Sequence, residues 1–154
     1  MIMVILYESP GSPGQVGPIP ITSWVGPWTQ EGIKVEGHEA LVALLLARYD
    51  IEANLKDLRG QSPLSLAAKN GHEGIVRLLV VRNDIHLNSK TSDGRSPLSF
   101  AAEKGREAVV RLLIACDGVD VNSKDKHGRT PLSFADGGGY EAIVRLLTES
   151  RMRN

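Results

Sequence analysis

The feature that most constrains this chain is an internal repeat. The segment from Ser96 to Leu113 (SPLSFAAEKGREAVVRLL) recurs as SPLSLAAKNGHEGIVRLL from Ser62 and as TPLSFADGGGYEAIVRLL from Thr130. A half copy, GHEALVALLL, begins at Gly37. The matched glycines, each 34 positions after the last, are Gly37, Gly71, Gly105 and Gly139. A fixed period of about 20 to 50 residues is typical of proteins built from stacked repeats, so the fold follows from the repeat unit.

Each unit predicts two short helices. In the second unit, Ser62 and Pro63 indicate a helix start, because the hydroxyl caps free N–H groups and proline has no N–H to satisfy. Gly71 is typical of a helix end, and the apolar stripe from Ile75 to Leu79 predicts a second helix. Helices of about eight residues are too short to be stable alone, so they must pack against each other and against neighbouring pairs.

The loops between the helix pairs carry turn residues at a recurrent spacing. They contain Leu-Asn or Val-Asn steps followed by Asp-Gly or His-Gly pairs, which favour tight turns. The whole unit resembles the ankyrin repeat, whose pattern is D-x-x-G-x-T-P-L-H-x-A-A-x-x-G-H. The matching residues are Asp57, Gly60, Ser62, Pro63, Leu64, Ala67, Ala68, Gly71 and His72, then Gly94, Ser96, Pro97, Leu98, Ala101, Ala102 and Gly105, then Asp125, Gly128, Thr130, Pro131, Leu132, Ala135 and Gly139. The resemblance covers about residues 37–148, and the linker and period are also similar to arrays in large fungal ankyrin proteins.

The resemblance implies an all-α fold, an ankyrin-repeat solenoid of stacked helix-turn-helix units with β-hairpin-like finger loops. We expect a Pro/Gly-rich, disordered leader at residues 1–27, a repeat domain at 28–148 and a tail at 149–154. The expected repeats are a degenerate first one at 28–61, two intact ones at 62–95 and 96–129, and a truncated last one at 130–148. In an alternative arrangement, Trp24 and Trp28 of the leader fold back and cap the first repeat.

The last unit departs from the pattern at the end of its first helix. Asp136 stands where the other units have Ala68 and Ala102, and two glycines follow it. A helix glycine costs about 1 kcal/mol relative to alanine, and a buried carboxylate costs more. We therefore expect a terminal repeat whose end is frayed and whose outer face no neighbour covers. The intact unit before it is the expected centre of stability, where truncation of Leu112 should cost about 2–5 kcal/mol if that side chain is buried.

Composition and motifs point away from catalysis. No glycine-rich phosphate loop follows a strand, no His-x-x-x-His or Cys-x-x-Cys spacing occurs, and the recurring serines lack a His/Asp constellation. We expect no enzyme, cofactor or metal site. Lys plus Arg and Asp plus Glu number 18 each, and no run approaches the ~20 apolar residues of a membrane span. The lone Cys116 suits a reducing compartment, so we expect an intracellular protein, cytoplasmic or nuclear, without membrane contact.

The expected function is non-catalytic protein–protein interaction, by a monomer, with an unknown protein partner. In ankyrin proteins the finger tips and first helices form a concave recognition surface. By that resemblance the candidate contacts are Leu58, Arg59, Gln61, Lys69 and Asn70, then Ser92, Asp93, Arg95, Glu103 and Lys104, then Lys126, His127 and Arg129. Basic residues outnumber acidic ones in each finger loop, so we expect the partner to present an acidic surface.

Two other functions stay open. The chain could be a detached scaffold or terminal segment of a larger multidomain ankyrin protein of signalling or receptor-like type. It could instead bind nucleic acid or a phosphate ligand through Arg77, Arg111 and Arg145, which line up one period apart. A row of this kind is more often a solvated outer face, and base-stacking aromatics and net positive charge are lacking.

Overall fold

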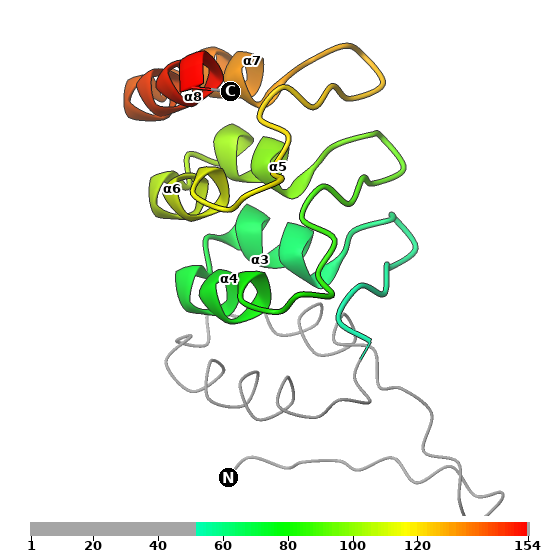
Figure 1. Cartoon of the computed structure of the whole chain (residues 1–154). Helices are drawn as coiled ribbons and strands as arrows, with labels where there is room; N and C mark the ends of the chain where they lie inside the picture. The colour runs from blue at the N-terminus through cyan, green and yellow to red at the C-terminus, as the bar shows by residue number, and fades with distance from the viewer. Residues whose placement is uncertain (1–51, 154) are drawn as a thin grey trace, which may run out of the picture.

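In the computed structural model, which describes residues 52–153, three helix pairs are stacked one upon another (Figure 1). The first helices of the pairs are α3 (Pro63–Asn70), α5 (Pro97–Glu103) and α7 (Pro131–Gly137). The second helices are α4 (Glu73–Val80), α6 (Glu107–Ile114) and α8 (Glu141–Arg153). A long loop precedes each pair and projects to one side of the stack (Figure 1). The described residues contain no strand, so the expected all-α solenoid with finger loops is confirmed.

The leader, its proposed tryptophan cap and the first repeat up to residue 51 lie outside the described residues. The division of the whole chain into domains therefore stays a prediction.

The first helices start and stop where the sequence predicts. The hydroxyls of Ser62 and Ser96 accept hydrogen bonds from backbone N–H groups three residues later, both at 3.2 Å, and a proline follows each cap. The helix α3 ends at Gly71, whose φ of 80° is left-handed and suits glycine best. Its N–H bonds back to carbonyls of the last turn. Local hydrogen bonds of these kinds fix the helix bounds.

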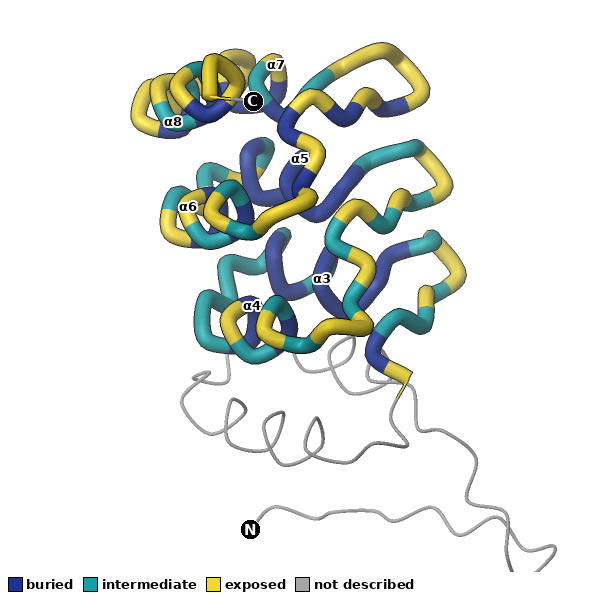
Figure 2. Tube along the Cα trace, in the orientation of Figure 1, coloured by how far each residue is buried: buried dark blue, intermediate teal, exposed yellow. Residues whose placement is uncertain are grey.

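The core lies between the two helix layers and between successive pairs (Figure 2). Small residues such as Ala67 and Ala101 are fully buried, and they let neighbouring first helices approach closely. In α6 Leu113 has no exposed surface, whereas Leu112 is only partly buried. Leu113 shares the inner stripe of the helix with Val109 and Val110. The core leucine of this helix is therefore Leu113 and not Leu112.

The last repeat is not frayed, contrary to expectation. Its second helix, α8, has 13 residues, compared with 8 in α4 and in α6, and it runs through the segment assigned to the tail. The hydroxyl of Thr148 donates to the carbonyl of Val144 at 2.7 Å, and Ser150 is buried, so the added turns are anchored. Asp136 is exposed, as expected for a face that no described neighbour covers.

Candidate functional site

Each finger loop is closed by the same backbone hydrogen bonds. In the first described finger, the N–H of Asp57 donates to the carbonyl of Gln61 at 3.0 Å, and the N–H of Gly60 donates to the carbonyl of Asp57 at 2.9 Å. The carboxylate of Asp57 accepts hydrogen bonds from two more backbone N–H groups of the loop, one of them that of Gln61. Equivalent bonds close the fingers around Gly94 and Gly128. The tips are therefore fixed by their own backbone.

Neighbouring fingers are also bonded to each other. The N–H of Ser92 donates to the carbonyl of Arg59 at 3.1 Å, and the N–H of Lys126 donates to the carbonyl of Asp93 at 3.0 Å. The ammonium group of Lys56 reaches the carbonyl of Lys90 at 2.8 Å. In the same register Lys90 reaches Lys124, and Asn54 and Asn88 bridge successive loops. The three fingers consequently form one continuous row.

The structure sorts the candidate contacts by exposure. Those exposed are Leu58, Arg59, Ser92, Asp93, Lys104, Lys126, His127 and Arg129, and those partly buried are Lys69, Asn70, Arg95 and Glu103. Gln61 is buried, and its side-chain amide donates to Asp57 at 3.3 Å. It therefore holds the base of its finger and offers little surface to a partner.

Arg95 lies inside a column of aromatic rings and charges. Its guanidinium is 5.8 Å from the ring centre of Phe100 and 5.0 Å from that of Phe134, and its Nη1 pairs with Glu103 at 3.0 Å. The guanidinium of Arg129 lies 4.7 Å from the ring centre of Phe134. Cations over aromatic faces are stabilised by the ring quadrupole. The two phenylalanines were not predicted as part of the site. Each follows its arginine by five positions, and this recurring spacing is the signal that could have identified them.

Arg129 forms an ion pair with Asp125 at 2.8 Å, and the side chain of Asp125 is fully buried. Burial by itself raises the pKa of Asp125. Hydrogen bonds from the backbone and side chain of Arg129 and from the backbone of His127 outweigh that effect. The pKa of this carboxyl is therefore below its usual value, and the last finger contains a charged, buried acid.

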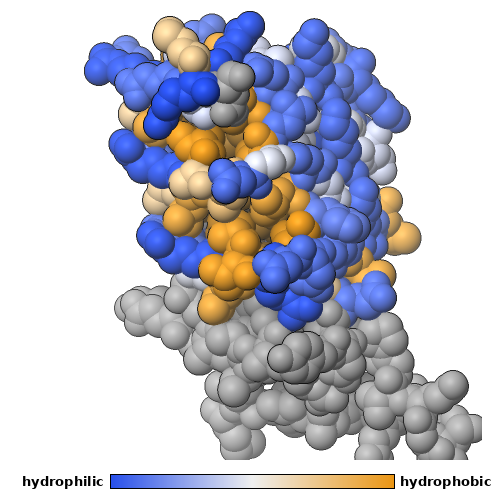
Figure 3. Space-filling view, viewed as in Figure 1, coloured by the Kyte–Doolittle hydropathy of each residue, from blue (hydrophilic) through white to orange (hydrophobic). Residues whose placement is uncertain are grey.

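Charge is divided unevenly between the two sides of the stack. We call the loops and first helices the finger side, which comprises residues 54–71, 88–105 and 122–139. We call the rest, which contains the second helices, the outer side, and it comprises residues 72–87, 106–121 and 140–153. The finger side carries nine Lys or Arg and five Asp or Glu residues, whereas the outer side carries seven of each. Hydrophilic residues dominate the finger loops in Figure 3. The excess of positive charge therefore belongs to the finger side alone.

On the outer side, each arginine of the row that repeats every 34 residues forms an ion pair with a glutamate of its own helix. Arg111 pairs with Glu107 at 2.6 Å, Arg77 pairs in the same way with Glu73, and the last pair, Arg145 with Glu141, is looser at 3.9 Å. Each glutamate lies in the first turn of its helix, where it is favoured by the positive end of the helix dipole. The three arginines therefore form ion pairs on exposed helix surfaces. Because each already has a glutamate partner, this arrangement argues against a row of phosphate-binding arginines.

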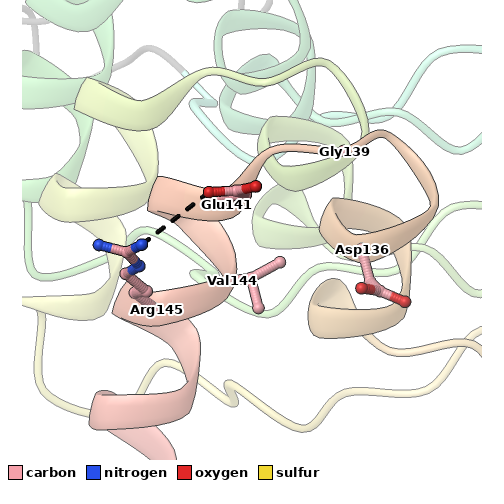
Figure 4. A pocket seen from close by; sticks show the side chains of 5 residues that line it. All are labelled: Asp136, Gly139, Glu141, Val144 and Arg145. Atoms are coloured by element: carbon pink, nitrogen blue, oxygen red, sulfur yellow. Dashed lines mark ion pairs between the residues drawn. The ribbon is translucent and has the colours of Figure 1, made fainter.

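A shallow pocket lies at the last helix pair, away from the finger tips (Figure 4). Its lining residues are Asp136, Gly139, Glu141, Val144 and Arg145. They include no histidine, cysteine or serine that could act as a nucleophile or base with them. Across residues 52–153 we find neither a cluster of metal-ligating side chains nor a helix long and apolar enough to cross a membrane.

The family model described as "Ankyrin repeats (3 copies)" matches residues 33–125 and, in an overlapping second match, residues 82–154. The matches include all three helix pairs and the finger row. No curated protein matches the chain.

Proposed function

Because the chain belongs to the ankyrin repeat family, we propose that it is a non-catalytic module that binds a partner protein through its finger side. Ankyrin repeats are in general protein-interaction modules. The finger side corresponds to the concave surface that the family resemblance implies. The exposed tip residues Arg59 and Lys126 are not among the side chains that bridge successive loops, so they are free to determine which partner is bound.

The observation that carries the proposal is the uneven charge of the two sides. The finger side has an excess of four positive charges, while the outer side is neutral. A partner with an acidic surface is therefore attracted to one side only, and electrostatic attraction of this kind raises association rates and selects the binding orientation.

The rigidity of the finger row supports the same proposal. Backbone bonds close each finger and join it to the next. A surface that is ordered before binding loses less conformational entropy when the complex forms. The row can therefore present Arg59 and Lys126 at fixed positions, and Lys104 follows the end of α5 on the same side. No contact of the described residues favours the nucleic-acid alternative in a comparable way.

The experiment compares two sets of charge reversals against one ligand. A peptide is first selected for binding to the wild-type chain from a displayed random library, and its affinity is measured by calorimetry. The finger variant, R59E/K104E/K126E, changes only exposed side chains. Arg95 is left intact because it is packed between rings and paired with Glu103. The control, R77E/R111E/R145E, makes the same change of charge on the outer side.

We expect the finger variant to bind at least about tenfold more weakly and the outer variant to bind within about twofold of wild type. We also expect the affinity of the wild-type chain to fall between about 50 mM and about 500 mM salt. Loss of binding in the outer variant with retention in the finger variant would contradict the proposal. Circular dichroism of both variants establishes that they remain folded.

A further inference from the structure

Two arginines that share one register position have different surroundings. Arg95 and Arg129 both precede a first helix by two residues, and each contacts a phenylalanine ring. In the middle repeat, Glu103 at the end of α5 supplies a carboxylate to Arg95 at 3.0 Å. The equivalent residue at the end of α7 is Gly137, which has no side chain. The last repeat therefore lacks the acid that completes this contact.

The space of the missing side chain is open. A Cβ atom added at Gly137 would meet nothing within 4 Å. The side chain of Arg129 is 44% exposed, compared with 20% for Arg95. No described group therefore fills the space beside Gly137, and the acid that pairs with Arg129 is Asp125 of the finger loop. An incoming group can therefore reach the guanidinium from the side on which Glu103 meets Arg95.

Part of the guanidinium is available for such a group. Asp125 engages Nε and Nη2 of Arg129 through a single oxygen, Oδ2. The Nη1 group of Arg129 donates no hydrogen bond to a described residue. In Arg95 the same group donates to Glu103. Phe134 covers one face of the guanidinium and shields it partly from water. Partial shielding strengthens a charge-assisted hydrogen bond.

We propose that Arg129 receives a Glu or Asp side chain of the partner, at the position that Glu103 occupies beside Arg95. This inference rests on the proposed function and adds the chemistry of one contact to it. The partner segment is an acidic peptide stretch that lies along the last finger, where Lys126 adds further positive charge. The bound carboxylate completes the column of charges and rings on the finger side.

A carboxylate suits this position better than a phosphate group does. Arg129 already forms an ion pair with the buried Asp125, so the pair as a whole carries no net charge. Asp125 already occupies Nε and Nη2, so the two-pronged contact that a phosphate group favours is not open, whereas a carboxylate can bind Nη1 alone, as Glu103 binds Arg95. The preference for an acidic over a phosphorylated segment is thus a consequence of the neighbouring carboxylate.

The test places a carboxylate of the chain itself at the position that we propose for the carboxylate of the partner. In the variant Gly137→Glu, a carboxylate occupies the proposed position and competes with the partner. Ala108→Glu adds the same charge at an exposed site in α6 on the outer side, so it is the matched control. A second variant, Arg129→Lys, keeps the positive charge beside Asp125 but removes the planar guanidinium fork.

The probe is an acetylated peptide of alternating Glu and Gly, compared with peptides that carry Gln or phosphoserine in place of Glu. Binding is followed in low salt by NMR spectroscopy. The side-chain Nε–H signal of Arg129 reports on the contact itself, and the backbone amide signals of the last finger give the affinity of every variant, including Arg129→Lys. We expect the Glu peptide to shift this signal and the Gln peptide to leave it unchanged. Gly137→Glu and Arg129→Lys should each weaken binding about five- to tenfold, and Ala108→Glu less than about twofold.

Four outcomes contradict the inference. They are no shift with the Glu peptide, an equal shift with the Gln peptide, tighter binding of the phosphoserine peptide, and equal affinities of Gly137→Glu and Ala108→Glu. If the R59E/K104E/K126E variant loses its selected peptide while Gly137→Glu binds the probe like wild type, the proposed function survives and only this contact is refuted. If R59E/K104E/K126E also retains its peptide, both proposals are wrong.

Discussion

Leu112 and Leu113 are adjacent in α6, yet they have different roles. Leu113 is fully buried on the inner stripe, whereas Leu112 is only partly buried beside it. We expect L113A to lower the free energy of unfolding by about 2–5 kcal/mol, because it leaves a cavity in a core that cannot close around it. The loss for L112A should be less than half as large, since part of that side chain is already in water. Urea denaturation of both variants measures the difference, and equal losses would contradict the assignment of the core.

Residues at the same register position can have different surroundings in different repeats. Gln61, Arg95 and Arg129 share one register position. Gln61 is buried at the base of its finger, Arg95 is held between two rings, and Arg129 is 44% exposed. The register predicts that all three lie on the finger side. It does not predict their exposure, because exposure depends on Phe134 and Glu103, which come from other elements.

At the scale of elements, the bounds of the first helices follow from local chemistry and were predictable. A hydroxyl and a proline start each of them, and those groups act within one turn of the chain. The length of α8 was not predictable from the repeat, because the matched pattern ends before the helix does. Its last turns depend on Thr148 and on the burial of Ser150, neither of which belongs to the repeat pattern.

The last finger is an element whose stability should depend on pH. The folded-state pKa of Asp125 is lowered, so as the pH falls the unfolded chain takes up the proton first. The stabilising contribution of Asp125 is therefore complete above the unfolded pKa of about 3.9 and is lost as the pH falls through the lower, folded pKa. We expect D125N to cost about 1–3 kcal/mol at neutral pH and much less in acid.

Thermal unfolding of D125N and wild type between neutral pH and about pH 2 measures this difference. D93N is the control, because Asp93 is an exposed carboxylate in the preceding finger. The loss of stability in D93N at neutral pH should be smaller than that in D125N, because Asp93 is exposed and Asp125 is buried. A D125N deficit that stays constant down to the lowest pH would show that the carboxylate contributes no charge-dependent stability.

At the scale of the whole molecule, the stack predicts an uneven distribution of stability. α5 contacts both α3 and α7, and α6 contacts both α4 and α8. Opening the middle pair breaks two interfaces, whereas opening the last pair breaks only the one that joins it to α5 and α6. In a repeat protein, stability is approximately a sum of the repeats and their nearest-neighbour interfaces. The middle pair should therefore open last.

Native-state hydrogen exchange tests this order residue by residue. We expect the slowest amides in α5 and α6, with exchange controlled by global unfolding, and faster exchange in α7 and α8 through opening of the last pair alone. L113A should speed exchange in the middle pair and in the last one, because both depend on the α6 core. The corresponding truncation of Leu147 in α8 should speed exchange in the last pair far more than in α5. Amides of α8 that exchange as slowly as those of α5 would contradict this order and would show that the three pairs unfold as a single cooperative unit.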